Sequence, residues 1–496
     1  MENKSIWQYG IKSLKYNKLD KDIRCDVLII GGGIAGLSCA YFLKNSKYKT
    51  VLVDKNMCGM GISARSTGKL TFMQDLIYNK IKDNYDEDKA LMYLNSQKDA
   101  VKIVRDIIIK NNIACNYDKT PSYVFTSDIK KLENFKKEIV FYDDNNIRYK
   151  VKNSIPLDYP CLYSLRVNYG GVFHPLKYLM ALRSIVSKDI DVYEDTTIVK
   201  LYKRNGGYVV HTDDNHIIKA TYVVVCTHYP FFIVPFFLPF KSSVEKSYLI
   251  CGESESNKGI QLISNENVSI SIRYHTDKGK NYIIYGRCSH VVCNHLDTRK
   301  QYKELIDEYK KYFKGKIKCY WLNHDIMSYD CIPYIGRINN SNLLVACGFN
   351  KWGNTNGTIA GKVIYDIIMG RENPYIELFN PCRGLSWNNF KNLVIYNFNT
   401  ISRYILNKLS PSMGYYEDDV KIETIDGKIC GIYTDKDKRR HIVSNICPHM
   451  KCNLIFNYKD KSWDCPCHGS RFDIDGNVVF GPAVYDIKID KKETSD

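Results

Sequence analysis

The stretch Asp26-Val-Leu-Ile-Ile-Gly-Gly-Gly-Ile-Ala-Gly36 decides the fold of the first part of the chain. Its apolar start is typical of a buried parallel strand, and residues 37–45 predict the helix that follows. Residues 49–54 predict a second strand, which ends on Asp54, eighteen residues past Gly36. A G-x-G-x-x-G turn between strand and helix, followed by an acid at this distance, predicts a Rossmann-like dinucleotide-binding unit.

In a dinucleotide-binding turn, each of the three glycines has a different structural role. Gly31 permits the tight turn, Gly33 lets the backbone approach a pyrophosphate, and Gly36 lets the helix pack closely. The N-terminus of the helix then faces the phosphates. Asp54 is expected to accept hydrogen bonds from ribose hydroxyls, which favours FAD or NAD over NADP. The alternative is a glycine-rich turn that binds no ligand.

A second informative stretch, Cys447 to Phe472, contains the pairs Cys447-x-His449 and Cys465-x-x-His468. Two thiolates and two imidazoles suit a [2Fe-2S] cluster whose two irons have different ligands. The same four side chains also suit a structural zinc ion. However, the spacing of a zinc finger, with histidines three to five residues apart on a helix, is absent from this stretch. The spacing therefore favours the iron–sulfur cluster.

These two loops resemble the cluster-binding loops of Rieske proteins. The tail Gly469-Ser-Arg-Phe472 and the turn Gly481-Pro-Ala483 belong to the same resemblance. It implies that the two cysteines of the pairs hold the buried iron and the two histidines hold the outer one. It also implies a disulfide between Cys452 and Cys467, which a reducing cytosol would oppose.

A loop rich in small residues, Gly59-Met-Gly-Ile-Ser-Ala-Arg-Ser-Thr-Gly-Lys69, follows the second predicted strand, and small residues let a backbone run beside a flat ring. Near the other end of this region, the apolar run from Leu343 leads into a glycine-rich loop and a helix over 358–369 that Gly370 ends. Together with the first glycine-rich turn, these features resemble the D-amino-acid, glycine and sarcosine oxidase superfamily of FAD-dependent oxidoreductases, which includes gamma-glutamylputrescine oxidoreductase.

This resemblance implies the architecture of the whole chain. The expected fold is an α/β FAD-binding domain (GR2-type, Rossmann-like) with an α+β substrate domain, followed by an all-β Rieske domain. The FAD-dependent oxidoreductase part is expected over 1–373, a connector over 374–411 and the Rieske [2Fe-2S] domain over 412–496. The FAD-binding pieces are expected at about 24–90, 170–230 and 330–373, and the substrate domain at about 91–169 and 235–329.

Candidate site residues follow from the turns and loops above. The expected FAD contacts are Gly31, Gly33, Gly36, Asp54, Ser63, Thr67, Gly348 and Gly353. Three cations are catalytic candidates. Arg65 and Lys69 could face the flavin or an anionic substrate group, although surface charges on a loop are an equal alternative. The resemblance places Lys351 near the flavin or the substrate carboxylate. His174 and His228 are tempting bases, but each is expected to make a local hydrogen bond beside its proline.

The composition is that of a globular protein, with 44% hydrophobic residues and an excess of 17 Lys and Arg spread along the chain. We find no nucleic-acid-binding module and no apolar run of membrane-spanning length. The first 25 residues lack the apolar segment of a secretory signal, so a cytoplasmic location is expected. The apolar segment 229–240 is expected in the core or as a lid over the substrate, with membrane or partner contact as a lesser alternative.

These features favour a flavin-dependent dehydrogenase that oxidises a CH–NH group of an amine or amino acid. FAD would pass the electrons to the Rieske cluster, and the cluster to a redox protein or quinone. The alternative is an electron-transfer flavo-iron–sulfur protein fed by a redox partner. NAD(P)H is disfavoured as the donor because only one G-x-G-x-x-G turn is found. A Rieske oxygenase is excluded because no His-x-x-x-His pair for a mononuclear iron remains among the 11 histidines.

Overall fold

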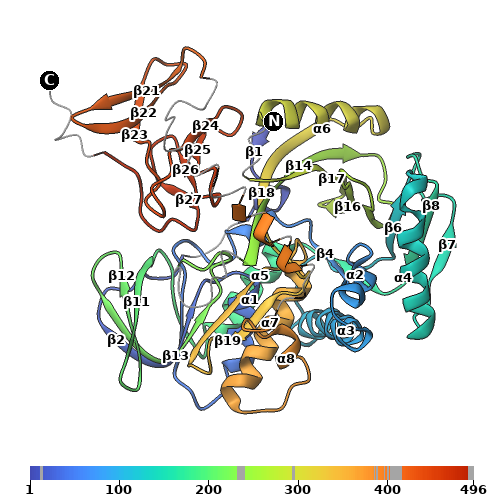
Figure 1. Ribbon diagram of the computed structural model, residues 1–496, viewed down its shortest axis with the longest axis horizontal. Helices are drawn as coiled ribbons and strands as arrows, with labels where there is room; N and C mark the ends of the chain where they lie inside the picture. Colours follow the sequence, from blue (N-terminus) through green and yellow to red (C-terminus); the bar gives the residue numbers. More distant parts are fainter. Residues whose placement is uncertain are drawn as a thin grey trace.

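The computed structural model describes residues 1–11, 15–231, 241–292, 297–384 and 416–489, and also residues 386, 389–391, 393–395, 397–398 and 402. In this part of the chain, two large sheets with their helices form the N-terminal part, and two small sheets form the C-terminal part (Figure 1). Most of the apolar segment 229–240 and a large part of the connector 374–411 lie outside the described residues, so those two expectations stay predictions.

The eight-stranded sheet is the dinucleotide-binding type of sheet that the first stretch predicted. Its strand order is β10-β3-β2-β13-β12-β11, and β20 pairs with β13 and with β19. Strands β10, β3, β2, β13 and β20 are parallel to one another. The bounds are β2 (Ile23–Ile30), β3 (Thr50–Val53), β10 (Asp191–Tyr193), β11 (Ile198–Arg204), β12 (Gly207–Thr212), β13 (Ile217–Val225), β19 (Tyr334–Arg337) and β20 (Leu343–Cys347). Three segments far apart in the sequence therefore build one sheet.

Helices α1 (Ile34–Leu43), α5 (Pro175–Val186) and α7 (Gly353–Met369) pack on this sheet and on each other. Glycines permit the close approach of α1 and α7, since a Cβ at Gly361 would lie 2.5 Å from the backbone nitrogen of Cys39. The predicted start of α7 at residue 358 was five residues too late. Its first turn has low helix propensity, but tertiary hydrogen bonds hold it, such as that from Asn354 Nδ2 to the Lys69 carbonyl at 2.9 Å.

The nine-stranded sheet has the order β1-β18-β14-β17-β16-β15-β6-β8-β7. Its strands are β1 (Glu2–Asn3), β6 (Ser122–Thr126), β7 (Lys150–Lys152), β8 (Tyr163–Val167), β14 (Ser242–Ser254), β15 (Gln261–Ser264), β16 (Ser271–Asp277), β17 (Lys280–Val291) and β18 (Ile317–Ser328). The charged segment 299–313 predicts a helix, and the structure confirms it as α6 (Thr298–Tyr312). This helix covers one face of the sheet by packing Tyr302, Leu305 and Tyr309 against β14 and β17.

A third, small sheet pairs β4 (Lys69–Thr71) and β5 (Asp118–Lys119) with β9 (Gly170–Val172). The remaining helices are α2 (Ile77–Asn84), α3 (Glu87–Lys110), α4 (Leu132–Asp144), α8 (Ile376–Phe379) and the short 3-10 turns at Ile6–Gln8, Ile62–Arg65 and Ile129–Lys131. The spacing of Val101, Val104, Ile107 and Ile108 predicts one apolar face of a helix over 86–113, and α3 with these four side chains buried confirms it. Helix α4 was not predicted, because the sequence from 115 to 170 carries few strong signals.

The C-terminal part is all-β, as expected. It contains a sheet of β21 (Val420–Ile425), β22 (Lys428–Thr434) and β23 (Arg440–Ser444), and a sheet of β24 (Ile455–Asn457), β25 (Ser462–Asp464), β26 (Arg471–Asp473) and β27 (Val478–Phe480). The dipeptides Asp426-Gly427 and Asp475-Gly476 are typical turns of β-hairpins, and they connect β21 to β22 and β26 to β27. Trp463 and Phe472 are fully buried at the centre of this part.

The C-terminal part packs beside β1, β18 and α6 of the N-terminal part (Figure 1). Hydrogen bonds join Asn3 to Asp460 (3.1 Å) and Thr298 to Asn457 (2.6 Å). Lys246 on β14 forms a buried ion pair with Asp464 on β25. Because these contacts come from three separate elements, they fix the orientation of the C-terminal part on the nine-stranded sheet.

Candidate functional site

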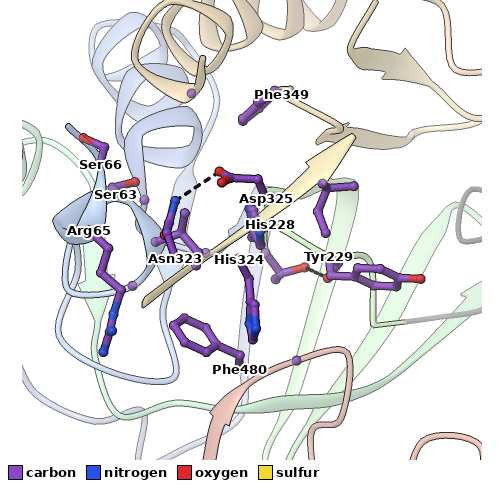
Figure 2. A pocket seen from close by; sticks show the side chains of 18 of the residues that line it. Ser63, Arg65, Ser66, His228, Tyr229, Asn323, His324, Asp325, Phe349 and Phe480 are labelled. Carbon is purple, nitrogen blue, oxygen red and sulfur yellow. Dashed lines mark hydrogen bonds between the residues drawn. The ribbon is translucent and has the colours of Figure 1, made fainter. Parts of the chain in front are cut away.

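A cavity of about 750 Å³ lies where the two large sheets meet the C-terminal part. Its walls come from the glycine-rich turn, from the loop over 60–69, from β14, β17 and β18, from the N-terminus of α7, and from residues 468–469 and 478–484. Figure 2 shows Ser63, Arg65 and Ser66 on one side of this cavity, Asn323 and Asp325 across from them, and Phe480 below.

The glycine-rich turn has the geometry that the sequence predicted for a dinucleotide site. Gly31 has φ +103°, and a Cβ there would lie 2.6 Å from the carbonyl oxygen of Cys226. A Cβ at Gly36 would lie 1.9 Å from the carbonyl oxygen of Gly31, so only glycine lets the turn fold back on α1. The cavity thus borders the N-terminus of α1, where free backbone N–H groups suit an anionic phosphate.

Asp54 lies beside this turn at the end of β3. Its carboxylate accepts hydrogen bonds from the backbone nitrogens of Gly32 (2.7 Å) and Asn56 (2.8 Å). Burial raises the pKa of Asp54 to about 6, although these two hydrogen bonds oppose the shift. Asp54 lines the cavity, so an acceptor for hydroxyl groups stands at the position where the sequence predicted a ribose contact.

The other expected FAD contacts fall into two groups. Ser63, Thr67 and Gly353 line the cavity with Gly31 and Gly33, and Ser63 Oγ accepts a hydrogen bond from the backbone nitrogen of Ile34 at 3.1 Å. Gly36 and Gly348 do not line the cavity: Gly36 packs within its own turn, and Gly348, with φ +73°, lies against Tyr334. The cradle of glycines, amides and one carboxylate fits an FAD molecule.

The three candidate cations all line the cavity, but the structure does not bring them together. The guanidinium of Arg65 lies 5.0 Å from the ring centroid of Phe480 and donates to the Leu322 carbonyl at 3.2 Å. The ammonium of Lys351 forms an ion pair with Glu245 at 2.7 Å. Arg65 and Lys351 are therefore already engaged with neighbouring groups.

Lys69 is buried and has no acidic partner among the described residues. Its Nζ donates to the Leu262 carbonyl and, at 2.7 Å, to Ser271 Oγ. Burial, together with the nearby positive charge of Arg273, lowers the pKa of Lys69 to about 7. A substantial fraction of this side chain is therefore a neutral amine at neutral pH.

The two histidines considered as bases differ in their surroundings. His174 caps α5, and its Nδ1 accepts a hydrogen bond from the backbone nitrogen of Lys177 at 3.2 Å, so the expected local bond is confirmed. For His228 the expectation of a local bond was wrong. Its ring contacts the backbone of His324 on β18, and its buried Nε2 has no partner within the described chain.

The polar residues Asn323, His324 and Asp325 on β18 were missed in the sequence. All three are buried and line the cavity (Figure 2). The only available signal was three consecutive polar residues within an otherwise apolar strand. Neither the face that they occupy nor their distance from the glycine-rich turn follows from the sequence.

The two Cys/His pairs of the C-terminal part meet in space. The ring centroids of His449 and His468 lie 5.1 Å apart, and the Nδ1 atom of each is buried without a hydrogen-bond partner among the described residues. The sulfur atoms of Cys447 and Cys465 contact each other, and Ser470 hydrogen-bonds the sulfur of Cys447. Two adjacent thiols and two unpartnered imidazole nitrogens fit the mixed ligation of a [2Fe-2S] cluster.

Cys452 and Cys467 form a disulfide, as the resemblance implied. Their sulfur atoms and the sulfur atom of Cys465 all lie within 4.8 Å of one another. Three cysteine sulfurs at this distance could suggest a metal site. Cysteines joined in a disulfide cannot act as thiolate ligands, so we reject a three-cysteine metal site. The disulfide instead ties the two loops that carry the Cys/His pairs.

One edge of this Cys/His centre faces the dinucleotide cavity. His468 and Gly469 line the cavity together with residues 478–484. A Cβ at Gly469 would lie 3.1 Å from Val244, so this loop is tightly packed against β14. The ring of Phe480 lies 4.9 Å from that of His324, centroid to centroid. The C-terminal part therefore forms one wall of the cavity.

Two known protein-family models match this chain. The model described as FAD dependent oxidoreductase matches residues 26–367, and the model described as Rieske [2Fe-2S] domain matches residues 409–489. The chain belongs to the FAD-dependent oxidoreductase family. This oxidoreductase uses FAD and carries a C-terminal Rieske domain with a [2Fe-2S] cluster.

Relatives match either almost the whole of this oxidoreductase or about three quarters of it. It is 30% identical to the putative Rieske 2Fe-2S iron-sulfur protein YhfW of Bacillus subtilis, over 98% of this chain and 97% of that protein. It is 24% identical to gamma-glutamylputrescine oxidoreductase of Escherichia coli, over 72% of this chain and 87% of that protein. The fold of glycine oxidase from Geobacillus kaustophilus matches 73% of this chain and 99% of its own, with a TM-score of 0.60 at 15% identity.

None of the helices in the described part of this oxidoreductase combines the length and apolar character needed to cross a membrane.

Proposed function

We propose that this oxidoreductase oxidises a CH–NH group of an amine or amino acid and delivers the electrons through its Rieske cluster to a redox protein or quinone. The observation that carries the proposal is the single cavity that both His468 and the glycine-rich turn line. A cluster ligand and a flavin site that share a cavity favour direct electron transfer between them. Gamma-glutamylputrescine oxidoreductase and glycine oxidase, by their names, act on an amine and an amino acid.

The residue roles in this proposal follow the geometry. Cys447 and Cys465 would hold one iron, and His449 and His468 the other. Gly31, Gly33, Asp54, Ser63, Thr67 and Gly353 would contact FAD, while Gly36 and Gly348 shape the turns. The FAD-binding pieces would be about 24–90, 170–230 and 330–373, the substrate domain about 91–169 and 235–329, and the Rieske domain 412–496.

When bound, FAD accepts a hydride and the cluster carries single electrons. The protein's own groups then position the reactants. The N-terminus of α1 faces the phosphates, and the N-terminus of α7, at Gly353, presents its positive dipole end to the cavity. Phe480, held between Arg65 and His324, excludes water on the Rieske side.

Lys69 is our candidate for the group that takes the proton of the substrate ammonium. An amine donates a hydride only after it loses this proton, because the nitrogen lone pair must be free. Lys69 lines the cavity, and its lowered pKa makes the neutral form available near pH 7. Arg65 and Lys351 have protein partners and act in positioning rather than in proton transfer.

Anaerobic mixing of the holoenzyme with amines and amino acids tests this function. We expect at least one of these compounds to bleach the flavin absorbance. If none does, while a reduced redox protein reduces the flavin or the cluster, the chain is an electron-transfer protein without a small organic substrate.

A further inference from the structure

Asp325 on β18 is a buried carboxylate in the wall of the cavity. It is 7% exposed. Its oxygens accept hydrogen bonds from Asn323 Nδ2 at 3.0 Å and from Ser247 Oγ at 3.2 Å. Both donors are uncharged. Across the described residues, no lysine, arginine or histidine nitrogen lies within 4.0 Å of this carboxylate. The negative charge of Asp325 therefore has no ion-pair partner among the residues that the structure describes.

The cation whose charge acts on Asp325, Lys351, already forms an ion pair with another carboxylate. Lys351 Nζ lies 2.7 Å from Glu245 Oε2 and donates to Ser289 Oγ at 2.6 Å. Burial raises the pKa of Asp325 to about 6, and the charge of Lys351 opposes that shift. Asp325 is thus largely ionised at neutral pH. Glu245, Lys351 and Asp325 together leave one uncompensated negative charge at this wall.

Asn323 supplies an independent sign that a ligand binds here. It is 7% exposed and lines the cavity, and its Oδ1 atom is buried without a hydrogen-bond partner within the described chain. Residues two apart on a strand share a face, so Asn323 and Asp325 both face the cavity (Figure 2). Ser247 pairs with Asn323 across β14 and β18 and lies on the same face. A buried acceptor without a donor normally marks a missing partner.

On the strand face that Asn323 and Asp325 share, the groups left free are hydrogen-bond acceptors. A protonated amine offers three donors and no acceptor, so it complements a carboxylate together with an amide oxygen. A hard metal ion is a poorer match, because Ca²⁺ takes about six to eight oxygen ligands and this wall offers far fewer. A substrate carboxylate would be repelled by Asp325.

We propose that Asp325, Asn323 and Ser247 form a subsite that binds a protonated amine of the substrate, distinct from the CH–NH group that is oxidised. This inference rests on the proposed function and narrows its substrate to molecules with two amine groups. The bound group is not the reacting one, because a carboxylate stabilises the protonated form, whereas hydride transfer requires the free amine.

The test compares α,ω-diaminoalkanes with monoaminoalkanes of matched chain length on the anaerobic holoenzyme. Binding is measured as the rise in Tm that each compound causes, and turnover as the KM for flavin reduction. We expect the diamine to bind about 10- to 100-fold more tightly than the monoamine, as for one buried charge-assisted hydrogen-bonded contact. Asp325→Asn should remove this preference while keeping bound FAD and the Rieske absorption.

Two further variants keep the test conclusive if Asp325→Asn fails to fold. Asn323→Ala removes the unpartnered acceptor and should weaken the diamine preference in the same direction. Asp277→Asn, which removes a carboxylate of the same sheet that pairs with Lys177 away from the cavity, should leave the preference unchanged.

Equal binding of diamines and monoamines to the wild type would overturn the proposal, as would an unchanged preference in both Asp325→Asn and Asn323→Ala. Loss of FAD from Asp325→Asn with the cluster retained would also overturn it, because Asp325 would then be a flavin contact. If no amine reduces the flavin, the proposed function fails, but the Tm shifts still decide whether this wall binds a diamine.

Discussion

Lys246 on β14 and Asp464 on β25 form an ion pair of 2.7 Å that is buried between the nine-stranded sheet and the Rieske domain. Asp464 immediately precedes Cys465 and also lies 3.4 Å from Arg471. On β14, Lys246 is followed by Ser247, which lines the cavity. The ion pair therefore links the residue before Cys465, a proposed cluster ligand, to strand β14, which lines the cavity through Ser247.

Lys246→Met should weaken the docking of the Rieske domain. Removing one partner of a buried ion pair lowers stability by about 3–5 kcal/mol. Because Arg471 remains near Asp464, we expect a loss at the lower end of this range. We expect a larger radius of gyration in small-angle scattering and slower reduction of the cluster by the flavin. Lys177→Met, which breaks the more exposed pair with Asp277, is the matched control and should cost no more than about 1 kcal/mol. Equal effects of both variants would contradict this role of Lys246.

Phe480→Ala should open the cavity on the Rieske side. The ring lies against both Arg65 and His324 and is 8% exposed. Its removal should leave a void and admit water and small solutes to the flavin. We expect faster quenching of flavin fluorescence by iodide and faster reoxidation by oxygen. Tyr485→Ala, at a site that is 47% exposed, should change neither rate, and unchanged quenching in Phe480→Ala would show that Phe480 does not close the cavity.

Gly36→Ala should abolish FAD binding but leave the Rieske cluster in place. The added Cβ would lie 1.9 Å from the Gly31 carbonyl oxygen, which forces the turn away from α1. The measurement is the ratio of flavin to protein, with Rieske absorption as the internal reference. Gly384→Ala, at a position with open space around the added Cβ, should retain FAD. Full flavin content in Gly36→Ala would show that this turn does not hold the cofactor.

Lys69→Met should remove a pH-dependent step from flavin reduction. The lowered pKa of about 7 means that Lys69 gains its neutral, proton-accepting form as the pH rises through this value. We therefore expect the anaerobic rate of flavin reduction by an amine to increase between about pH 6 and pH 8 in the wild type. The variant should be slower and should lack the inflection near pH 7. An identical inflection in Lys69→Met would assign that proton transfer to another group.

The sequence predicted those parts of the fold that depend on local spacing. The turn from Gly31 to Gly36 follows from its glycines, the helix Pro175–Val186 from a proline at its first position, and the Rieske hairpins from their Asp-Gly turns. The start of α7 was placed too late, since tertiary hydrogen bonds of Asn354 and its neighbours override their low helix propensity. Helix α4 was missed for lack of a strong local signal.

The site could be predicted only where the residues that bind a cofactor lie close together in the sequence. The Cys/His pairs and the glycine-rich turn are of this kind. Asn323 and Asp325 face the cavity only because β18 pairs with β14 in one particular register, which no local pattern determines. The contact between Phe480 and His324 depends on how two domains dock, and the sequence gives no signal for it.

Electron transfer from the flavin to the Rieske cluster can be tested by rapid anaerobic mixing with an amine that reduces the flavin. Flavin absorbance and the low-temperature EPR signal of the reduced Rieske cluster are followed in time. We expect that flavin bleaching comes first, that the cluster signal then grows, and that Lys246→Met slows only the second phase. Flavin reduction by substrate without any later reduction of the cluster would contradict this electron transfer.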